Sequence, residues 1–394
     1  MRNVSDLVAG ASLGGPLRLN LSSVLGLFAI FWAGSLVLPA VLAGTWRQVR
    51  GLRAAILLVL FLTGWLAVGF IVHGVHASLY REWVRLISVI AVALVAANLL
   101  SLSPSRAATL TIVALALPTA VAILQLVANL SAIGPQGSNE FFRATGTFVQ
   151  ANKAAQSFLL ALGVGGWAAL QWRTRLVGVV VSAASSVAIL ATRSLGGIAA
   201  AGTAVVAFLV LRPVSARFRL AVVGVLVAFA VVFALSPFGS SRIALLADTR
   251  MPWDIVGKTH NSLEWRFFNW WQLMQDWSRQ PVLGHGLGST LELVRPIDFI
   301  THSDLVRLLV EGGIVGAGIA LTCIGWAFAA TARVVRQATP GTVPLATIML
   351  SVMIGLSVQS LVQNTLSNTA LLYMLAAILP TLWIVPRHGS SAVP

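Results

Sequence analysis

Charged residues are scarce in this chain, and their scarcity excludes a soluble fold. Asp, Glu, Lys and Arg together make up 9% of the 394 residues, whereas soluble globular proteins contain about 25%. Hydrophobic residues reach 58% and the mean hydropathy is +0.90. Because apolar segments recur almost to the end of the chain, we expect one membrane domain over residues 1–394.

Cysteine and acidic residues are also rare. Cys323 is the single cysteine, so the chain has no partner for an internal disulfide. Eleven acidic residues stand against 26 basic ones, and the net charge is +15. The basic residues sit in short loops between apolar segments, which is typical of membrane orientation signals and not of nucleic-acid binding. Arg47, Arg50 and Arg53 follow the first long apolar run, which favours a retained span over a cleaved signal peptide.

Apolar runs long enough to cross about 30 Å of hydrocarbon predict a polytopic bundle. Such segments must satisfy their own backbone hydrogen bonds, so we expect an all-α fold. The stretch Leu7–Leu19 is too short to cross alone but can form a half-hairpin with its neighbour, so the total is eleven or twelve spans. The eleven expected spans are 22–43, 54–72, 84–102, 107–130, 154–172, 176–192, 195–211, 218–235, 305–332, 343–361 and 366–385.

The loops between these spans divide the charge unequally between the two sides of the membrane. One side carries twelve arginines and no acidic residue, and the other carries the remaining basic residues with all eleven acidic ones. The positive-inside rule makes the first side cytoplasmic, so the long loop over residues 236–304 faces outward. The twelve are Arg47, Arg50, Arg53, Arg106, Arg173, Arg175, Arg212, Arg217, Arg219, Arg333, Arg336 and Arg387.

The expected spans contain little that ionises. Asn98 and Gln125 are their main polar side chains, and bonding to a neighbouring helix is the simpler role for both. Ion-coupled transporters usually need charges within the membrane. This pattern therefore argues against proton- or sodium-driven transport and directs attention to the outer face.

Two short outer segments carry basic residues beside helix starts. The sequence FRATGTFVQANKAAQ contains Arg143 and Lys153, and its turn residues end in a helix start at Asn152. The sequence TRSLGG brings Arg193 to the outer surface where one helix ends and the next begins. A helix N-terminus beside an arginine is suited to binding an anion, although a solvated loop and an interfacial anchor are the plain alternatives.

The long outer loop predicts an amphipathic helix in the membrane interface. The sequence SLEWRFFNWWQLMQDWSRQ places its apolar residues at helical spacing. Arg266 and Asn269 share one helical face, and tryptophans such as Trp265 and Trp270 suit either an aromatic membrane belt or stacking on sugar rings. The following GHGLG is a flexible turn and not a dinucleotide-binding motif.

The sequence THSDLVRLLVEGGIVG opens the ninth span and puts His302 at its outer mouth. A histidine there can accept a proton or donate a hydrogen bond. Arg307 and Glu311 are spaced for a structural ion pair. Uncharged amides, which suit sugar hydroxyls or any wet helical hairpin, gather at the last outer turn: Gln359, Gln363, Asn364 and Asn368.

The ordered set RATGTF, TRSLGG, WRFFNWW, PVLGHGLGS and HSDLVRLLVEGGIVG resembles the O-antigen ligase and polysaccharide polymerase family of bacterial envelopes. The motif-bearing part runs from Arg143 to Gly316, and a looser similarity of topology covers the whole chain. The resemblance implies a multi-pass protein of the bacterial inner membrane, similar to GT-C glycosyltransferases, with its active site facing the periplasm. It also implies a metal-free reaction without a cofactor.

The resemblance further implies the substrates and a division of roles among the candidate residues. The donor is a glycan on undecaprenyl diphosphate, and the acceptor is lipid A-core or another glycan. Arginines suit a diphosphate because they form planar, two-point hydrogen bonds with it. The hypothesis assigns the diphosphate to Arg193 and Arg266 with help from Arg143 or Lys153, catalysis to His302 and Arg266, and the glycan or acceptor to Trp265, Asn269, Trp270, Gln363 and Asn364.

Several alternatives remain open at this stage. Glu264, Asp298 and Asp304 are other candidate bases. A polymerase that joins carrier-linked repeat units differs from a ligase only in its acceptor. A lipid-linked oligosaccharide flippase needs a cationic route through the bundle, and a membrane O-acyltransferase needs its histidine deep in a tunnel, so both fit the sequence less well.

Overall fold

The computed structural model is an all-α membrane bundle. It describes residues 21–99, 102–128, 143–148, 150–212, 215–247, 249–255, 261–291, 293–294, 301–337 and 343–384. All regular secondary structure in these ranges is helical, and none of it is strand. The all-α expectation is therefore confirmed.

All eleven expected spans correspond to helices. The bounds are α2 Leu21–Leu42, α3 Leu52–His73, α4 Ala77–Asn98, α5 Pro104–Val127, α6 Ala151–Ala169, α7 Arg175–Ala191, α8 Leu195–Leu211, α9 Ala216–Leu235, α12 Asp304–Gln337, α13 Val343–Val362 and α14 Thr369–Ile384. Five of the described helices are long and apolar enough to cross a membrane by these measures alone, and four more are apolar but shorter. The candidate segment Leu7–Leu19 lies outside the described residues.

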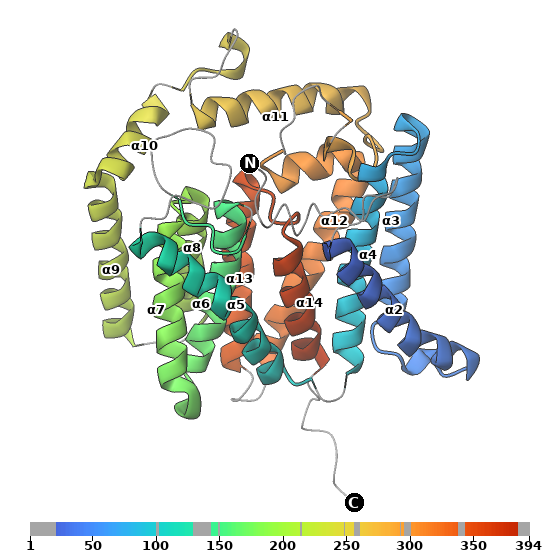
Figure 1. The fold of residues 1–394 in the computed structure, drawn as a ribbon, viewed down its shortest axis with the longest axis horizontal. Coiled ribbons are helices and arrows are strands. Elements are labelled where there is room, and N and C mark those ends of the chain that lie inside the picture. Colours follow the sequence, from blue (N-terminus) through green and yellow to red (C-terminus); the bar gives the residue numbers. More distant parts are fainter. Residues whose placement is uncertain are drawn as a thin grey trace, which may run out of the picture.

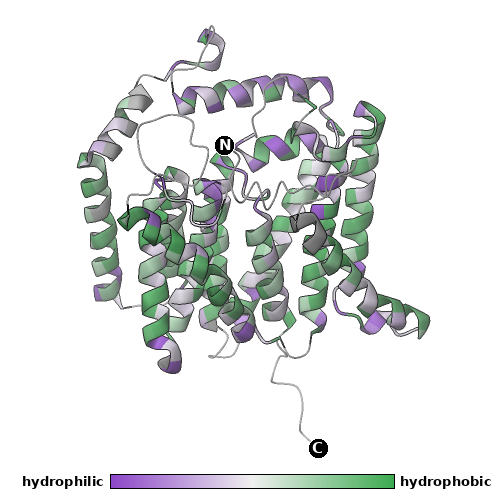
Figure 2. Cartoon of the chain, in the orientation of Figure 1, coloured by the Kyte–Doolittle hydropathy of each residue, from purple (hydrophilic) through white to green (hydrophobic). Residues whose placement is uncertain are grey.

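The long loop between α9 and α12 contains two helices of its own. They are α10, Pro237–Ala247, and α11, Ser262–Arg279. Figure 1 shows α11 lying across one end of the bundle, nearly at right angles to the spans below it. Apolar residues cover the spans, whereas α11 mixes polar and apolar residues (Figure 2). The predicted amphipathic helix is thus confirmed.

The main core lies where α6, α8 and α13 meet. Phe158 and Leu160 from α6 and Met349 from α13 are fully buried there. Small residues permit close approach, since a Cβ added at Gly355 of α13 would lie 2.4 Å from the carbonyl oxygen of Ala200 in α8. Close contacts at small residues are a common source of helix association in membranes.

Helix α12 is broken at Gly313, whose φ of 59° and ψ of −164° are not helical. The segment Pro281–Gly286 fills the break with backbone hydrogen bonds. His285 N and Gly286 N donate to the carbonyl oxygens of Val310 and Glu311, and Ile314 N and Val315 N donate to those of Pro281 and Val282. Backbone groups freed inside a membrane bundle need such partners, so this segment makes the break tolerable.

Gly313→Ala should destabilise the folded protein because alanine disfavours this backbone conformation. The new Cβ would also lie 2.3 Å from the carbonyl oxygen of Val282. We expect a loss of about 1–3 kcal/mol in unfolding free energy, measured by denaturant or thermal unfolding of the purified protein. Gly318→Ala is the matched control, because its Cβ meets nothing within 4 Å in the same helix. Equal stability of the two variants would contradict this account of the break.

Candidate functional site

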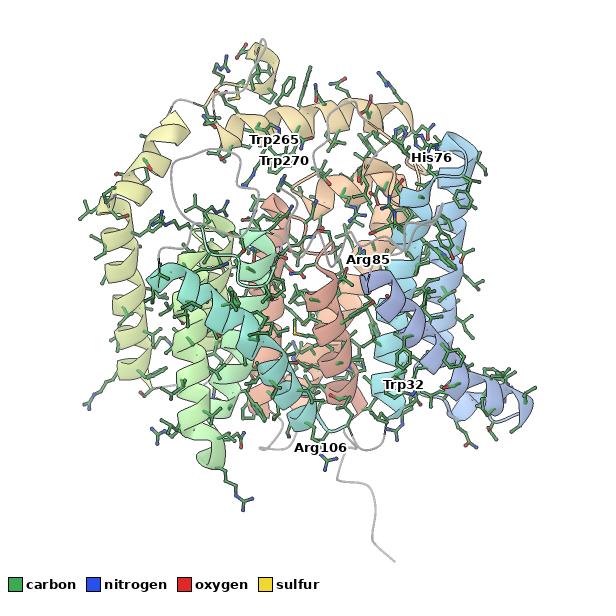
Figure 3. The ribbon with its side chains drawn as sticks, viewed as in Figure 1. Trp32, His76, Arg85, Arg106, Trp265 and Trp270 are labelled. Atoms are coloured by element: carbon green, nitrogen blue, oxygen red, sulfur yellow. The ribbon has the colours of Figure 1, made fainter. Side chains whose placement is uncertain are left out.

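Helix α11 brings its first turns against the start of α12. Asn261 caps α11, since its side-chain oxygen accepts from the backbone N–H groups of Leu263 and Glu264, both at 2.9 Å. The indole N–H of Trp270 donates to the carbonyl oxygen of Thr301 at 2.9 Å. Trp265 and Trp270 lie at the end of the molecule opposite Arg106 (Figure 3). The candidate site therefore sits at the end away from the Arg106 loop.

His302 lies at the junction between these two helices. Its ring makes an edge contact with Trp265, with 5.1 Å between the ring centroids. Its φ of 49° is in the left-handed region, which non-glycine residues rarely adopt and which is more frequent at functional sites. Burial, and secondly the positive charge of Arg266, lowers the pKa of His302 from 6.5 to about 4. The imidazole is therefore neutral at pH 7.

Arg193 also has a left-handed backbone, with a φ of 48°. It occupies the tight turn between α7 and α8, where Ser194 caps α8 by accepting from Gly197 N at 3.2 Å. Arg143 supports this turn, because its Nε donates to the carbonyl oxygen of Thr192 and its Nη2 to Asn152, both at 2.9 Å. Arg143 thus joins the turn to the start of α6.

A polar pocket lies beside His302 and gathers residues from three parts of the chain. The first turn of α6 contributes Lys153, and the turn between α13 and α14 contributes Gln363 and Asn364. Gln363 also donates to Ser194 Oγ at 3.4 Å, so the pocket adjoins the Arg193 turn. The full lining is Gln150, Asn152, Lys153, Gln156, His302, Gln363, Asn364 and Ser367.

The turn after α13 is held in place by Asp304. One carboxylate oxygen of Asp304 accepts from Thr365 N at 2.7 Å and from Leu366 N at 3.0 Å. On the other side, Asn368 donates to Gln156 at 3.0 Å. The sequence proposed Asp304 as an alternative base, and the structure gives it a second, positioning role. Gln156 and Asp304 are site residues whose positioning contacts the sequence pattern did not reveal.

A buried ion network lies between α4 and α12. Arg307 donates to Glu311 at 2.9 Å and to Glu82 at 2.7 Å, and Glu82 also pairs with Arg85. The predicted pair of Arg307 and Glu311 is confirmed. The prediction that the spans contain little that ionises is wrong. Arg85, Arg307 and Glu311 lie within the expected spans, and α4, which begins at Ala77 and not near residue 84, adds Glu82.

Some candidates have structural partners away from the pocket. Glu264 is fully buried and pairs with Arg250, whose Nε and Nη2 donate to its two oxygens at 3.0 Å. This pairing argues against Glu264 as a base. Gln125 accepts from the backbone N–H groups of Thr145 and Gly146, and Asn98 bonds to the backbone of Arg50. Both roles are structural, but the partners are loop residues and not the neighbouring helices that were expected.

Two other candidates, Asn269 and Asp298, are not among the residues that line the pocket. Asn269 is buried within α11, and Asp298 lies outside the described residues. In the described ranges, no three His, Cys, Asp or Glu side chains are grouped so that they could hold a metal ion.

The fold and the site define a polytopic, all-α membrane protein with a cationic, amide-rich site at one end. Residues 179–321 match the family model of the O-antigen ligases. This match supports the family resemblance seen in the sequence. Members of the family are membrane enzymes of the glycosyltransferase kind that act on lipid-linked glycans and acceptors. No curated protein matches the chain.

The lowered pKa of His302 predicts a specific pH dependence of stability. Between pH 6.5 and about 4 the unfolded chain binds a proton at this position and the folded protein does not. Stability should therefore fall as the pH is lowered through this window. We expect the melting temperature of the wild type to fall more steeply than that of His302→Asn when both are melted from pH 7 to pH 4. Parallel curves would contradict a buried, neutral His302.

Proposed function

We propose that this protein transfers a glycan from undecaprenyl diphosphate to a lipid A-core or similar acceptor. The reaction takes place at the outer leaflet of the bacterial inner membrane, with the site facing the periplasm and residues 236–304 forming the outer loop. The observation that carries this proposal is that His302 lines a pocket of amides with one lysine and lies close enough to Arg266 to feel its charge. A base with a cation and sugar-binding groups nearby suits this transfer.

The diphosphate is the leaving group and takes up negative charge as the anomeric C–O bond breaks. Arg193 and Arg266 bind it and stabilise that charge through charge-assisted hydrogen bonds. The acceptor hydroxyl attacks the anomeric carbon, and its proton passes to His302. Arg143 supports the Arg193 turn through Thr192. No step in this scheme requires a metal ion.

Donor binding should make His302 a stronger base by raising its pKa. A base with a pKa of about 4 is weak at neutral pH, and general bases work best when their pKa lies near the working pH. The charge of Arg266 contributes to this low value. A diphosphate bound to Arg266 offsets that charge, so the pKa of His302 rises when the donor is present. Deprotonation of the acceptor is thereby coupled to donor binding.

The remaining candidates bind sugar. Trp265 lies against His302 with its ring partly exposed, which suits stacking on a sugar face. Gln363 and Asn364 line the pocket and offer amides to hydroxyl groups. Trp270 supports this wall from α11 through its bond to Thr301, and Asn269 of the same helix is assigned to the glycan with it. Glycan polymerisation uses the same arrangement with a carrier-linked repeat as the acceptor.

The purified protein should transfer glycan from undecaprenyl diphosphate to a lipid A-core acceptor, measured by product size. Arg266→Ala and His302→Ala should each lower the rate by about 100-fold or more, because each removes a group acting in the transition state. Arg279→Ala is the matched control, since Arg279 lies in α11 with 76% of its side chain exposed. A chelator should leave the rate unchanged.

The same assay separates the acceptors. A single transfer to lipid A-core supports a ligase, whereas a ladder of products made without lipid A-core identifies a polymerase. Wild-type rates in both Arg266→Ala and His302→Ala would refute the site.

A further inference from the structure

The pocket beside His302 lies next to buried acidic residues, but none of them lines it. Its lining consists of amides, a hydroxyl, one imidazole and one lysine, and includes no carboxylate. The acidic side chains of the adjoining ion network, Glu82 and Glu311, pair with Arg85 and Arg307. Within the described part of the chain, Lys153 has no carboxylate at ion-pair distance. In this lining, Lys153 is the residue suited to binding an anion.

The start of α6 adds to this positive potential. Gln150, Asn152 and Lys153 come from its N-cap and first turn, and no side chain caps this end. The N–H groups of a first helical turn lack partners within the helix and carry a partial positive charge. Helix α6 has 19 residues, so its dipole is well developed. An anion in the pocket would meet both this helix end and Lys153.

An amide at the pocket wall independently indicates a ligand. Asn364 is only 7% exposed, and its Oδ1 is buried without a hydrogen-bond partner, while its Nδ2 donates to Thr301 Oγ1 at 3.4 Å. Buried polar atoms are nearly always hydrogen-bonded. A hydroxyl group bound in the pocket would supply the missing donor. The pocket thus suits a ligand that combines hydroxyl groups with a negative charge.

We propose that a sugar unit of the acceptor sits over this pocket with an anionic substituent directed into it, and that Lys153 recognises that substituent. A sugar carboxylate and a sugar phosphate share this chemistry. This inference rests on the proposed function and deepens it, because it assigns Lys153 to the acceptor and leaves the donor diphosphate to Arg193 and Arg266. The sugar hydroxyls bind Asn364 and the neighbouring amides, which puts the acceptor beside His302.

Binding of small sugars to the full chain in lipid nanodiscs tests the assignment. The probes are D-glucuronate, D-glucose 6-phosphate, D-glucose and inorganic diphosphate, followed by ligand-observed NMR. The wild type should bind one of the two anionic sugars at least about tenfold more tightly than glucose, since a charge-assisted hydrogen bond contributes that much or more. Lys153→Gln should abolish this preference and leave glucose binding unchanged, and Lys153→Arg should retain it.

Arg193→Gln separates this site from the donor site. Arg193→Gln should weaken the binding of inorganic diphosphate and preserve the preference for the anionic sugar. Lys153→Gln should preserve the binding of inorganic diphosphate and abolish that preference. The proposal is overturned if no sugar binds, if glucose binds the wild type as tightly as both anionic sugars, or if Lys153→Gln weakens diphosphate alone. Each of these results can occur while glycan transfer from undecaprenyl diphosphate is intact, so failure here is distinguishable from failure of the proposed function.

Discussion

The hydrogen bonds that join the segment Pro281–Gly286 to the break in α12 determine where the candidate site lies. Without them, the carbonyl group of Val310 would lack its partner inside the bundle, and that of Glu311 would keep only the indole N–H of Trp65. The same segment follows directly from the end of α11, so these bonds also attach α11 to the bundle. The N-terminal half of α11 then reaches the start of α12, where Trp265 meets His302. A membrane helix broken at a glycine thereby positions a catalytic candidate at a distance from the break.

The arginines divide into those that hold the fold and those proposed for substrate. Arg307 and Arg250 are tied to buried carboxylates, Arg307 to Glu82 and Glu311, and Arg250 to Glu264. Breaking a buried ion pair by removing one partner lowers the stability of the fold strongly, so these three ion pairs are structural. Lys153 instead lines a pocket of neutral groups beside the neutral imidazole of His302. The positive charge of this lysine suits a substrate that brings its own negative charge.

The sequence predicted most of the bundle because long apolar runs have few alternatives in a membrane. It placed the start of α4 too late, since Arg81 and Glu82 interrupt the apolar pattern there. The charge that compensates Glu82 belongs to Arg307, 225 residues further along the chain. Such a distant pairing leaves no mark in local hydropathy. The break at Gly313 was equally hidden, because its partners come from another segment.

The candidate site was predicted in part. His302, Lys153, Gln363 and Asn364 come from separate blocks of sequence, and the structure brings them to one pocket. The role of Asp304 in holding the last turn depends on two backbone N–H groups, which no side-chain pattern reveals. The left-handed backbone of Arg193 and His302 also depends on the folded chain.

The most direct test of the central claim is a structure of the protein in a lipid nanodisc with a non-hydrolysable undecaprenyl diphosphonate glycan, determined by electron cryomicroscopy. The account predicts density for the two phosphorus groups between Arg193 and Arg266, with the anomeric carbon facing His302. Density for the phosphorus groups at the Arg106 end of the bundle, or away from both arginines, would contradict it.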